Sequence, residues 1–215
     1  MVTKRTNVIV LKDVRIAFPH VYEPVRPYGT EAETEEDVSK KKEWSAQIRI
    51  SKEQFDRVKE LIGKVAQEKW GQKATQMLKK ISMNSPKNMC CREFEDENTG
   101  ETYYAINAKR KEYRGKNGQG GKNLPPQTCG LDWKRMTTAD DPEAITDGCF
   151  ANVKLSFFCY DQVVIGVGCD LCALQFLKSG EPFGKGGVRV EDGDFPDLSA
   201  QSTVGNMPEN EEDPW

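Results

Sequence analysis

Five segments of the chain are rich in β-branched and aromatic residues and are bounded by Gly, Pro, Asn or Asp, a pattern typical of β-strands. These segments are residues 7–18, 43–51, 102–113, 149–160 and 163–177. Only Asp161 and Gln162 separate the last two, which predicts a two-residue hairpin. The hydrophobic pattern therefore predicts five main strands, the last two of them paired.

One segment between the second and third strands follows a helical period instead. Phe55, Val58, Ile62 and Val65 are spaced by three or four residues, and Ser51 stands at the position of an N-cap. We expect a mainly β fold, a five-stranded barrel of the oligonucleotide/oligosaccharide-binding (OB) type with one amphipathic helix after the second strand. A β-sandwich is the alternative architecture.

The charge divides the chain into a basic body and an acidic tail. Residues 191–215 contain eight acidic side chains and no Lys or Arg, so residues 1–190 carry a net charge of +5 although the whole chain is at −3. The tail is also rich in Pro, Ser and Asn with few aliphatic residues, which is typical of disorder. We predict an OB-like nucleic-acid-binding domain over residues 1–186 and a disordered acidic tail over residues 187–215.

The third strand, TYYAINAKRKEY, has two chemically different faces because successive side chains point to opposite sides of a sheet. One face holds Tyr104, Ile106 and Ala108, which we assign to the core. The other alternates rings and cations, and residues 109–122 contain six basic side chains but one acid. Rings that stack on bases and cations that follow phosphates are what binding of single-stranded nucleic acid requires. A solvated hairpin with a flexible tip is the simpler alternative.

The fourth strand repeats this division, with Val153, Leu155 and Phe157 on its core face. Its opposite face would expose aromatic rings, which nucleic acid, a loop or another subunit could cover. Trp44 shares the side of Ala46 and is assigned to the core. The candidate nucleic-acid-binding residues are Arg49, Tyr103, Lys109, Arg110, Lys111, Tyr113, Arg114, Lys116, Lys122, Trp133, Lys134, Arg135, Lys154, Phe158 and Tyr160.

Other site chemistries are weakly supported. Cys169 and Cys172 have the spacing of zinc ligands, but residues three apart on a strand point to opposite faces, so we interpret the seven cysteines as reduced, mostly buried thiols. The only histidine, His20, has no evident nucleophile to serve. A metal-dependent nuclease is the alternative function, and its candidate ligands are Asp140, Asp141, Glu143 and Asp147. We expect no catalytic residue, no metal and no cofactor, and hence no enzyme.

The basic β-rich body with one helix, the motif DWKRM, Gly148 and the acidic ending ENEEDPW together resemble the single-stranded DNA-binding proteins of tailed phages. The resemblance implies a modified OB barrel and a tail that covers the DNA groove or recruits replication partners. This chain departs from that family at Trp215, where phenylalanine is usual, and in the loop GKNGQGGKNLPP. The residues of the tail that we expect to bind partners are Glu209, Glu211, Glu212, Asp213 and Trp215.

These features predict a protein that binds single-stranded DNA, and duplex DNA or RNA more weakly, in phage replication, recombination or repair. Duplex DNA and RNA are included because a basic groove accepts any polyanion. A recombination mediator that anneals strands is a further alternative, since it would use the same groove. The chain has no apolar run of about 18 residues and its first segment is interrupted by Lys12, Asp13 and Arg15, so we expect neither a membrane span nor a signal peptide. The expected location is the cytoplasm of the infected host cell.

Overall fold

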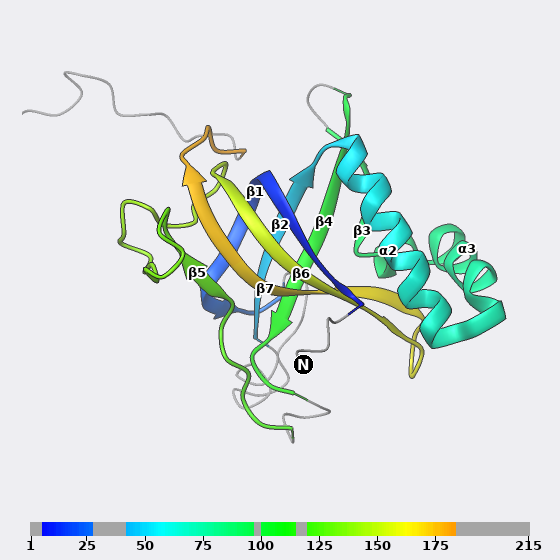
Figure 1. Cartoon of the computed structure of the whole chain (residues 1–215). Coiled ribbons are helices and arrows are strands. Elements are labelled where there is room, and N and C mark those ends of the chain that lie inside the picture. The colour runs from blue at the N-terminus through cyan, green and yellow to red at the C-terminus, as the bar shows by residue number, and fades with distance from the viewer. Residues whose placement is uncertain (1–5, 28–41, 97–99, 115–119, 184–215) are drawn as a thin grey trace, which may run out of the picture. The chain divides into compact units, whose positions relative to one another are not determined.

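The computed structural model describes residues 6–27, 42–96, 100–114 and 120–183, whose strands form one sheet (Figure 1). The order of the strands in the sheet is β3-β4-β2-β1-β6-β7-β5. Every pair is antiparallel except β5 with β7. The strands are β1 (Val8–Val25), β2 (Glu43–Ile50), β3 (Cys91–Glu95), β4 (Thr102–Lys111), β5 (Gln127–Cys129), β6 (Phe150–Tyr160) and β7 (Gly166–Lys178).

The core lies on one face of the strongly curved sheet. Ile106 and Ala108 of β4 and Val153, Leu155 and Phe157 of β6 are almost fully buried there, which confirms the predicted division of both strands into two faces. Tyr104 is half-buried against the ring of Phe55, and Trp44 is buried as expected.

Strand β1 produces much of the curvature because it pairs with two strands along its length. Its first half pairs with β6 and its second half with β2, and its register shifts between Leu11 and Val14. Asp13 has a φ of 52° within this bulge, and its backbone N–H donates to Asn152 Oδ1 at 3.2 Å. A bulge sharpens the twist of a strand, so β1 can turn from one neighbour to the other.

The far strands β4 and β7 approach each other without forming a ladder. Between them lies Cys90, whose N–H donates to the Val167 carbonyl at 3.1 Å and whose carbonyl accepts from Asn107 N–H at 2.8 Å. In Figure 1 β7 curves past the carboxyl end of β4. The sheet has seven strands and is not closed, so the predicted five-stranded barrel is not confirmed.

Helix α2 (Lys52–Trp70) begins where the sequence predicted and packs Phe55, Val58 and Ile62 into the core. Ser51 is its N-cap: the hydroxyl accepts from Gln54 N–H, and the Gln54 side chain accepts from Ser51 N–H. A second helix, α3 (Ala74–Asn84), lies next to α2 (Figure 1) and was not predicted. Neither has both the length and the apolar character that crossing a membrane requires, and no other helix in the described residues does.

Three sequence predictions about the strands need correction. Strands β3 and β5 were not predicted, and β5, with three residues, is too short to give a periodic pattern. The connection between β6 and β7 is not a two-residue hairpin but comprises residues 161–165. Val163 is 95% exposed in this loop, so its apolar side chain is not part of a strand as predicted. The predicted tail, residues 187–215, lies outside the described residues.

Candidate nucleic-acid interface

A groove of about 1180 Å³ lies along the line where β4 meets β6 and β7. The outward faces of β4 and β6, which the sequence marked as candidate binding surfaces, both contribute to it. The segment 87–90, which leads into β3, closes one side. Charged and aromatic side chains that line the groove are Glu43, Lys87, Lys109, Arg110, Lys111, Arg114, Phe158, Tyr160 and Asp170.

The aromatic part of the groove depends on two glycines. Phe158 and Tyr160 of β6 stand directly opposite Gly168 and Gly166 of β7, and the two ring centroids are 6.2 Å apart. A side chain at Gly168 would overlap the Phe158 ring, and one at Gly166 would overlap the Tyr160 ring. Because glycine has no side chain, both rings can lie against the backbone of β7. Phe158 keeps 46% of its surface exposed and offers a face on which a base can stack.

The cations of the groove come mainly from the carboxyl-terminal half of β4. Lys109 and Lys111 lie on its outward face and are exposed. Arg114 follows β4 and donates from Nε to Asn123 Oδ1 at 2.6 Å. Lys87 faces the same groove from the segment before β3. Positive side chains thus line the groove that also contains the two rings, which is the arrangement expected for a single strand.

Two of these cations are already paired with carboxylates. Lys109 Nζ lies 3.2 Å from Glu43 Oε1, and the Glu43 side chain is only 10% exposed. Arg110 makes two parallel hydrogen bonds to Asp170, at 2.9 and 2.7 Å. In the described part of the chain no such partner is found for Lys111. The groove is therefore less positive than a count of its basic residues suggests.

The Arg110–Asp170 pair also stabilises the curved sheet, because it joins β4 to β7. Arg110 projects from β4 and Asp170 from β7, so the bidentate contact spans the line where the two strands have no ladder. The hydrogen bonds with Asp170 raise the pKa of Arg110 above its ordinary value. Arg110, which the sequence predicted to bind DNA, thus stabilises the groove through this pair.

Tyr113 and Lys122 belong to a hairpin beyond β4 rather than to the groove itself. They are paired by a single antiparallel bridge, and Lys122 Nζ lies 2.8 Å from the carboxylate of the buried Glu112 and 6.0 Å from the Tyr113 ring centroid. That contact with Glu112 raises the pKa of Lys122. Lys116, at the predicted tip of this hairpin, lies outside the described residues.

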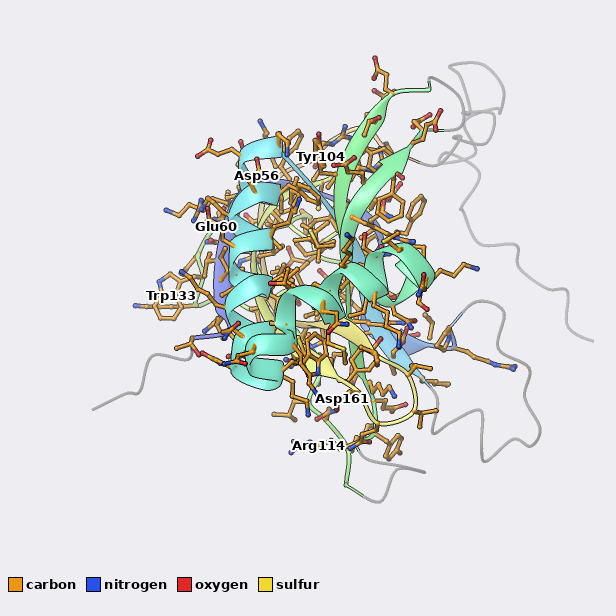
Figure 2. All side chains as sticks on the ribbon, turned by 90° about the vertical axis from the view of Figure 1, so that its right-hand side faces the viewer. Asp56, Glu60, Tyr104, Arg114, Trp133 and Asp161 are labelled. Atoms are coloured by element: carbon orange, nitrogen blue, oxygen red, sulfur yellow. The ribbon has the colours of Figure 1, made fainter. Side chains whose placement is uncertain are left out.

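Four other candidates lie away from the groove. Tyr103 and Arg49 contact each other near the opposite end of β4, with the guanidinium 4.1 Å from the ring centroid. Trp133 and Lys134 are exposed on the loop between β5 and β6, and Figure 2 shows Trp133 well separated from Arg114. The sequence could not show this separation, because it depends on how the sheet curves.

The loop that carries Trp133 is held by carboxylates that the nuclease hypothesis had assigned to metal. Arg135 forms ion pairs with Asp141 and Glu143, and the contact with Arg135 lowers the pKa of Asp141. Asp147 accepts from the backbone N–H groups of Phe18 and Phe183, both at 2.8 Å. These acids therefore have structural contacts, and no cluster of metal-ligating side chains occurs within the described ranges.

Lys154 is exposed on the outward face of β6, beyond the lining of the groove. Lys87 and the two glycines opposite the rings were not predicted from the sequence. A Gly-x-Gly stretch that pairs with Phe-x-Tyr on the neighbouring strand is the signal that could have indicated the glycines.

The cysteines behave as the sequence predicted. Cys90, Cys91, Cys149 and Cys169 are buried, and all seven thiols are free. Cys169 points into the core, while Cys172 contacts Asp170 on the outer face, so the two thiols cannot coordinate one zinc ion. Burial raises the pKa of Cys91 to about 12.

The fold and the groove together are those of a β-sheet module suited to single-stranded nucleic acid. The chain matches the family described as "Enterobacter phage Enc34, ssDNA-binding protein" over residues 6–204. It belongs to this family of phage single-stranded DNA-binding proteins, which are not enzymes. The non-enzymatic class predicted from the sequence agrees with this assignment.

Individual relatives extend the comparison. Putative protein p50 of Acyrthosiphon pisum secondary endosymbiont phage 1 is 30% identical over 197 residues, which are 89% of this chain and 94% of that protein. The single-stranded DNA-binding protein of bacteriophage Enc34, solved with ssDNA, gives a TM-score of 0.54 at 17% identity over 84% of this chain and 91% of that one. Gp2.5 of bacteriophage T7, also a single-stranded DNA-binding protein, gives a TM-score of 0.50 at 13% identity over 87% of this chain and 99% of that one. At these identities the structural likeness concerns the fold.

Proposed function

We propose that this protein coats single-stranded DNA during phage DNA replication, recombination or repair, and that the strand lies in the groove between β4, β6 and β7. The observation that carries the proposal is the pair of rings, Phe158 and Tyr160, lying on glycine backbone beside exposed lysines. Membership of the Enc34 family supports the same substrate.

The geometry indicates how a strand would bind. Bases stack on the exposed face of Phe158 and on Tyr160, while Lys111, Arg114 and Lys87 contact the phosphates. Stacking needs unpaired bases, so duplex DNA should bind more weakly through phosphates alone. RNA offers the same rings and charges, and we expect it to bind in the same groove with lower affinity.

Other candidate residues have secondary parts in this proposal. Lys109 and Arg110 reach phosphates only by exchanging their carboxylate partners, and Tyr113 and Lys122 would contact the strand as it leaves the groove. Lys116, outside the described residues, stays a predicted contact. Trp133, Lys134 and Arg135 are not proposed as contacts, because their loop lies apart from the lining of the groove.

We further propose that the acidic residues of 191–215 compete with DNA for the basic surface. Eight carboxylates tethered to a body of +5 act at an effective concentration on the order of millimolar. The segment that contains Glu209, Glu211, Glu212, Asp213 and Trp215 would also bind replication or recombination proteins, with the ring filling a pocket rimmed by basic residues. The protein would act in the cytoplasm of the infected host cell.

The test is fluorescence anisotropy with labelled oligo-dT, with and without magnesium, beside a matched duplex and an RNA. Phe158→Ala should weaken oligo-dT binding by about five- to 150-fold, the equivalent of about 1–3 kcal/mol per stacked base. Trp133→Ala is the matched control, since it removes a ring that is 69% exposed but lies outside the groove. Equal losses in the two variants, or loss of intact DNA when magnesium is added, would contradict the proposal.

A further inference from the structure

Apart from the groove, a row of rings and cations crosses the outer face of the sheet. It follows the strand order from β3 to β7 and consists of Phe94, Tyr103, Arg49, Arg15, Phe150 and Lys178. Phe94 is paired with Tyr103 in the ladder, Arg49 with Arg15, Arg15 with Phe150, and Phe150 with Lys178. The sheet therefore holds these four pairs at a fixed spacing, whereas Tyr103 and Arg49 are not ladder partners and meet only through their cation–π contact.

Most neighbours in this row are in ring-stacking or cation–π contact. The rings of Phe94 and Tyr103 are 5.4 Å apart and nearly parallel, with an interplanar angle of 10°. Lys178 Nζ lies 4.4 Å from the centroid of Phe150, and the Arg15 guanidinium lies 5.3 Å from the same centroid. Arg49 and Arg15 form the exception, because two like charges stand opposite each other on adjacent strands, which is unfavourable.

A ring from outside the sheet fills the space between these two arginines. The guanidinium carbons of Arg49 and Arg15 lie 3.8 Å and 4.2 Å from the centroid of Phe183. A ring between two cations relieves their repulsion through its electron-rich faces. Phe183 follows β7, and its N–H is held by Asp147.

The backbone before Phe183 is also fixed. Arg15 donates to the carbonyls of Gly148 and Glu181. Gly148 has a φ of 81°, and a side chain there would overlap the backbone of Glu181. The segment therefore reaches the slot between the arginines as a defined part of the structure.

The charges at this slot are not neutralised. Within the described residues neither Arg15 nor Arg49 forms an ion pair, and Arg49 Nε is buried without a hydrogen-bond partner. This contrasts with Lys109 and Arg110 of the groove, which have carboxylate partners. A cavity of about 620 Å³ beside the slot is also lined by Lys12, by Asp13 and by Lys52, which is paired with Asp56 at 2.7 Å. The unpaired charge at the site is therefore that of the two arginines. The site combines a stacking position with unpaired positive charge.

We propose that the slot between Arg15 and Arg49 is a nucleobase-binding subsite that Phe183 occupies in the DNA-free protein. A bound strand replaces the phenyl ring with a base, which stacks between the same guanidiniums, and its phosphates take the unpaired charges. The proposal rests on the proposed function, because it assumes that the protein binds single-stranded DNA.

Removing the competing ring tests the subsite. Phe183→Ala should bind an oligo-dT of about 20 nucleotides at least about fivefold more tightly than the unmodified protein, because one base gains the slot without displacing a side chain. Adding Arg49→Met to Phe183→Ala should abolish this gain. Phe18→Ala is the matched control, since Phe18 N–H bonds to the same Asp147 carboxylate but its ring is 53% exposed and contacts neither arginine. It should leave the affinity unchanged.

Anisotropy and the unfolding temperature are measured for each variant. If folded Phe183→Ala binds no more tightly, or if Arg49→Met does not remove the gain, the subsite is wrong and Phe183 is an internal clamp. Should the alanine variant not fold, Phe183→Leu takes its place and should also bind more tightly, because leucine lacks the ring face that contacts the two guanidiniums and is displaced by a base more easily. Failure of the proposed function gives a different result, namely no oligo-dT binding by any variant, the unmodified protein included.

Discussion

Replacing Glu43 with Gln should strengthen DNA binding, although the change lies inside the groove. The Glu43 side chain is 10% exposed and contacts Lys109 Nζ at 3.2 Å. When Lys109 meets a phosphate in the unmodified protein, the Glu43 carboxylate loses its partner and must attract a cation from solution. Little net release of counterions results. In Glu43→Gln the lysine is free, and its contact with a phosphate releases a counterion.

The size of this effect follows from the salt dependence of binding. Each phosphate neutralised on a single strand contributes about −0.7 to the slope of log K against log salt concentration. Glu43→Gln should therefore make the slope steeper by about 0.7. Over a fourfold rise in salt, from about 50 to about 200 mM, the advantage of the variant should shrink by a factor of about 2.6.

The assay is anisotropy with labelled oligo-dT at five or more salt concentrations. Glu60→Gln is the matched control, because it removes the same charge from an exposed position on α2, away from Arg114 in Figure 2. The double variant Glu43→Gln, Lys109→Met removes the whole ion pair and should restore the original slope. An unchanged slope in Glu43→Gln, or the same change in Glu60→Gln, would refute the account of paired and unpaired cations.

Three further outcomes are expected. Gly168→Val should push the Phe158 ring off β7 and weaken oligo-dT binding about as much as Phe158→Ala, and binding at the unmodified level would contradict the aromatic platform. Deleting residues 191–215 should strengthen binding at low salt, with the two proteins converging above roughly 0.5 M, where screening removes both attractions; equal affinity at low salt would exclude self-competition. Because burial raises the pKa of Cys91 to about 12, its thiolate fraction at pH 8 is on the order of 10⁻⁴, and iodoacetamide followed by mass spectrometry should find it unmodified in the folded protein.

The sequence predicted the faces of the strands better than it predicted their neighbours. Alternation placed Ile106 and Phe157 in the core and Lys109 and Phe158 on the outside, because side-chain direction along a strand depends only on position. The start of α2 was predicted for the same reason, because the N-cap at Ser51 is also a local signal in the sequence. Strand β5 was not predicted, because three residues are too few to show an alternating pattern.

The composition of the groove could not be predicted in the same way. Lys109 and Phe158 were both identified as outward residues, but their meeting in one groove depends on the bulge in β1 and on β7 curving towards β4. Trp133 carries the same kinds of local signal, a ring beside cations, and lies elsewhere. The Arg15–Phe183–Arg49 stack joins three segments that are distant in the sequence, so no local pattern indicated it.

Photo-crosslinking tests the central claim that bases stack in the groove between β4, β6 and β7. The protein is irradiated with oligo-dT in which 5-iodo-deoxyuridine replaces thymidine at single positions, and the crosslinked peptides are identified by mass spectrometry. The account predicts crosslinks to Phe158 or Tyr160, whose rings lie on the glycines of β7. Crosslinks to Trp133, with none to Phe158 or Tyr160, would contradict it.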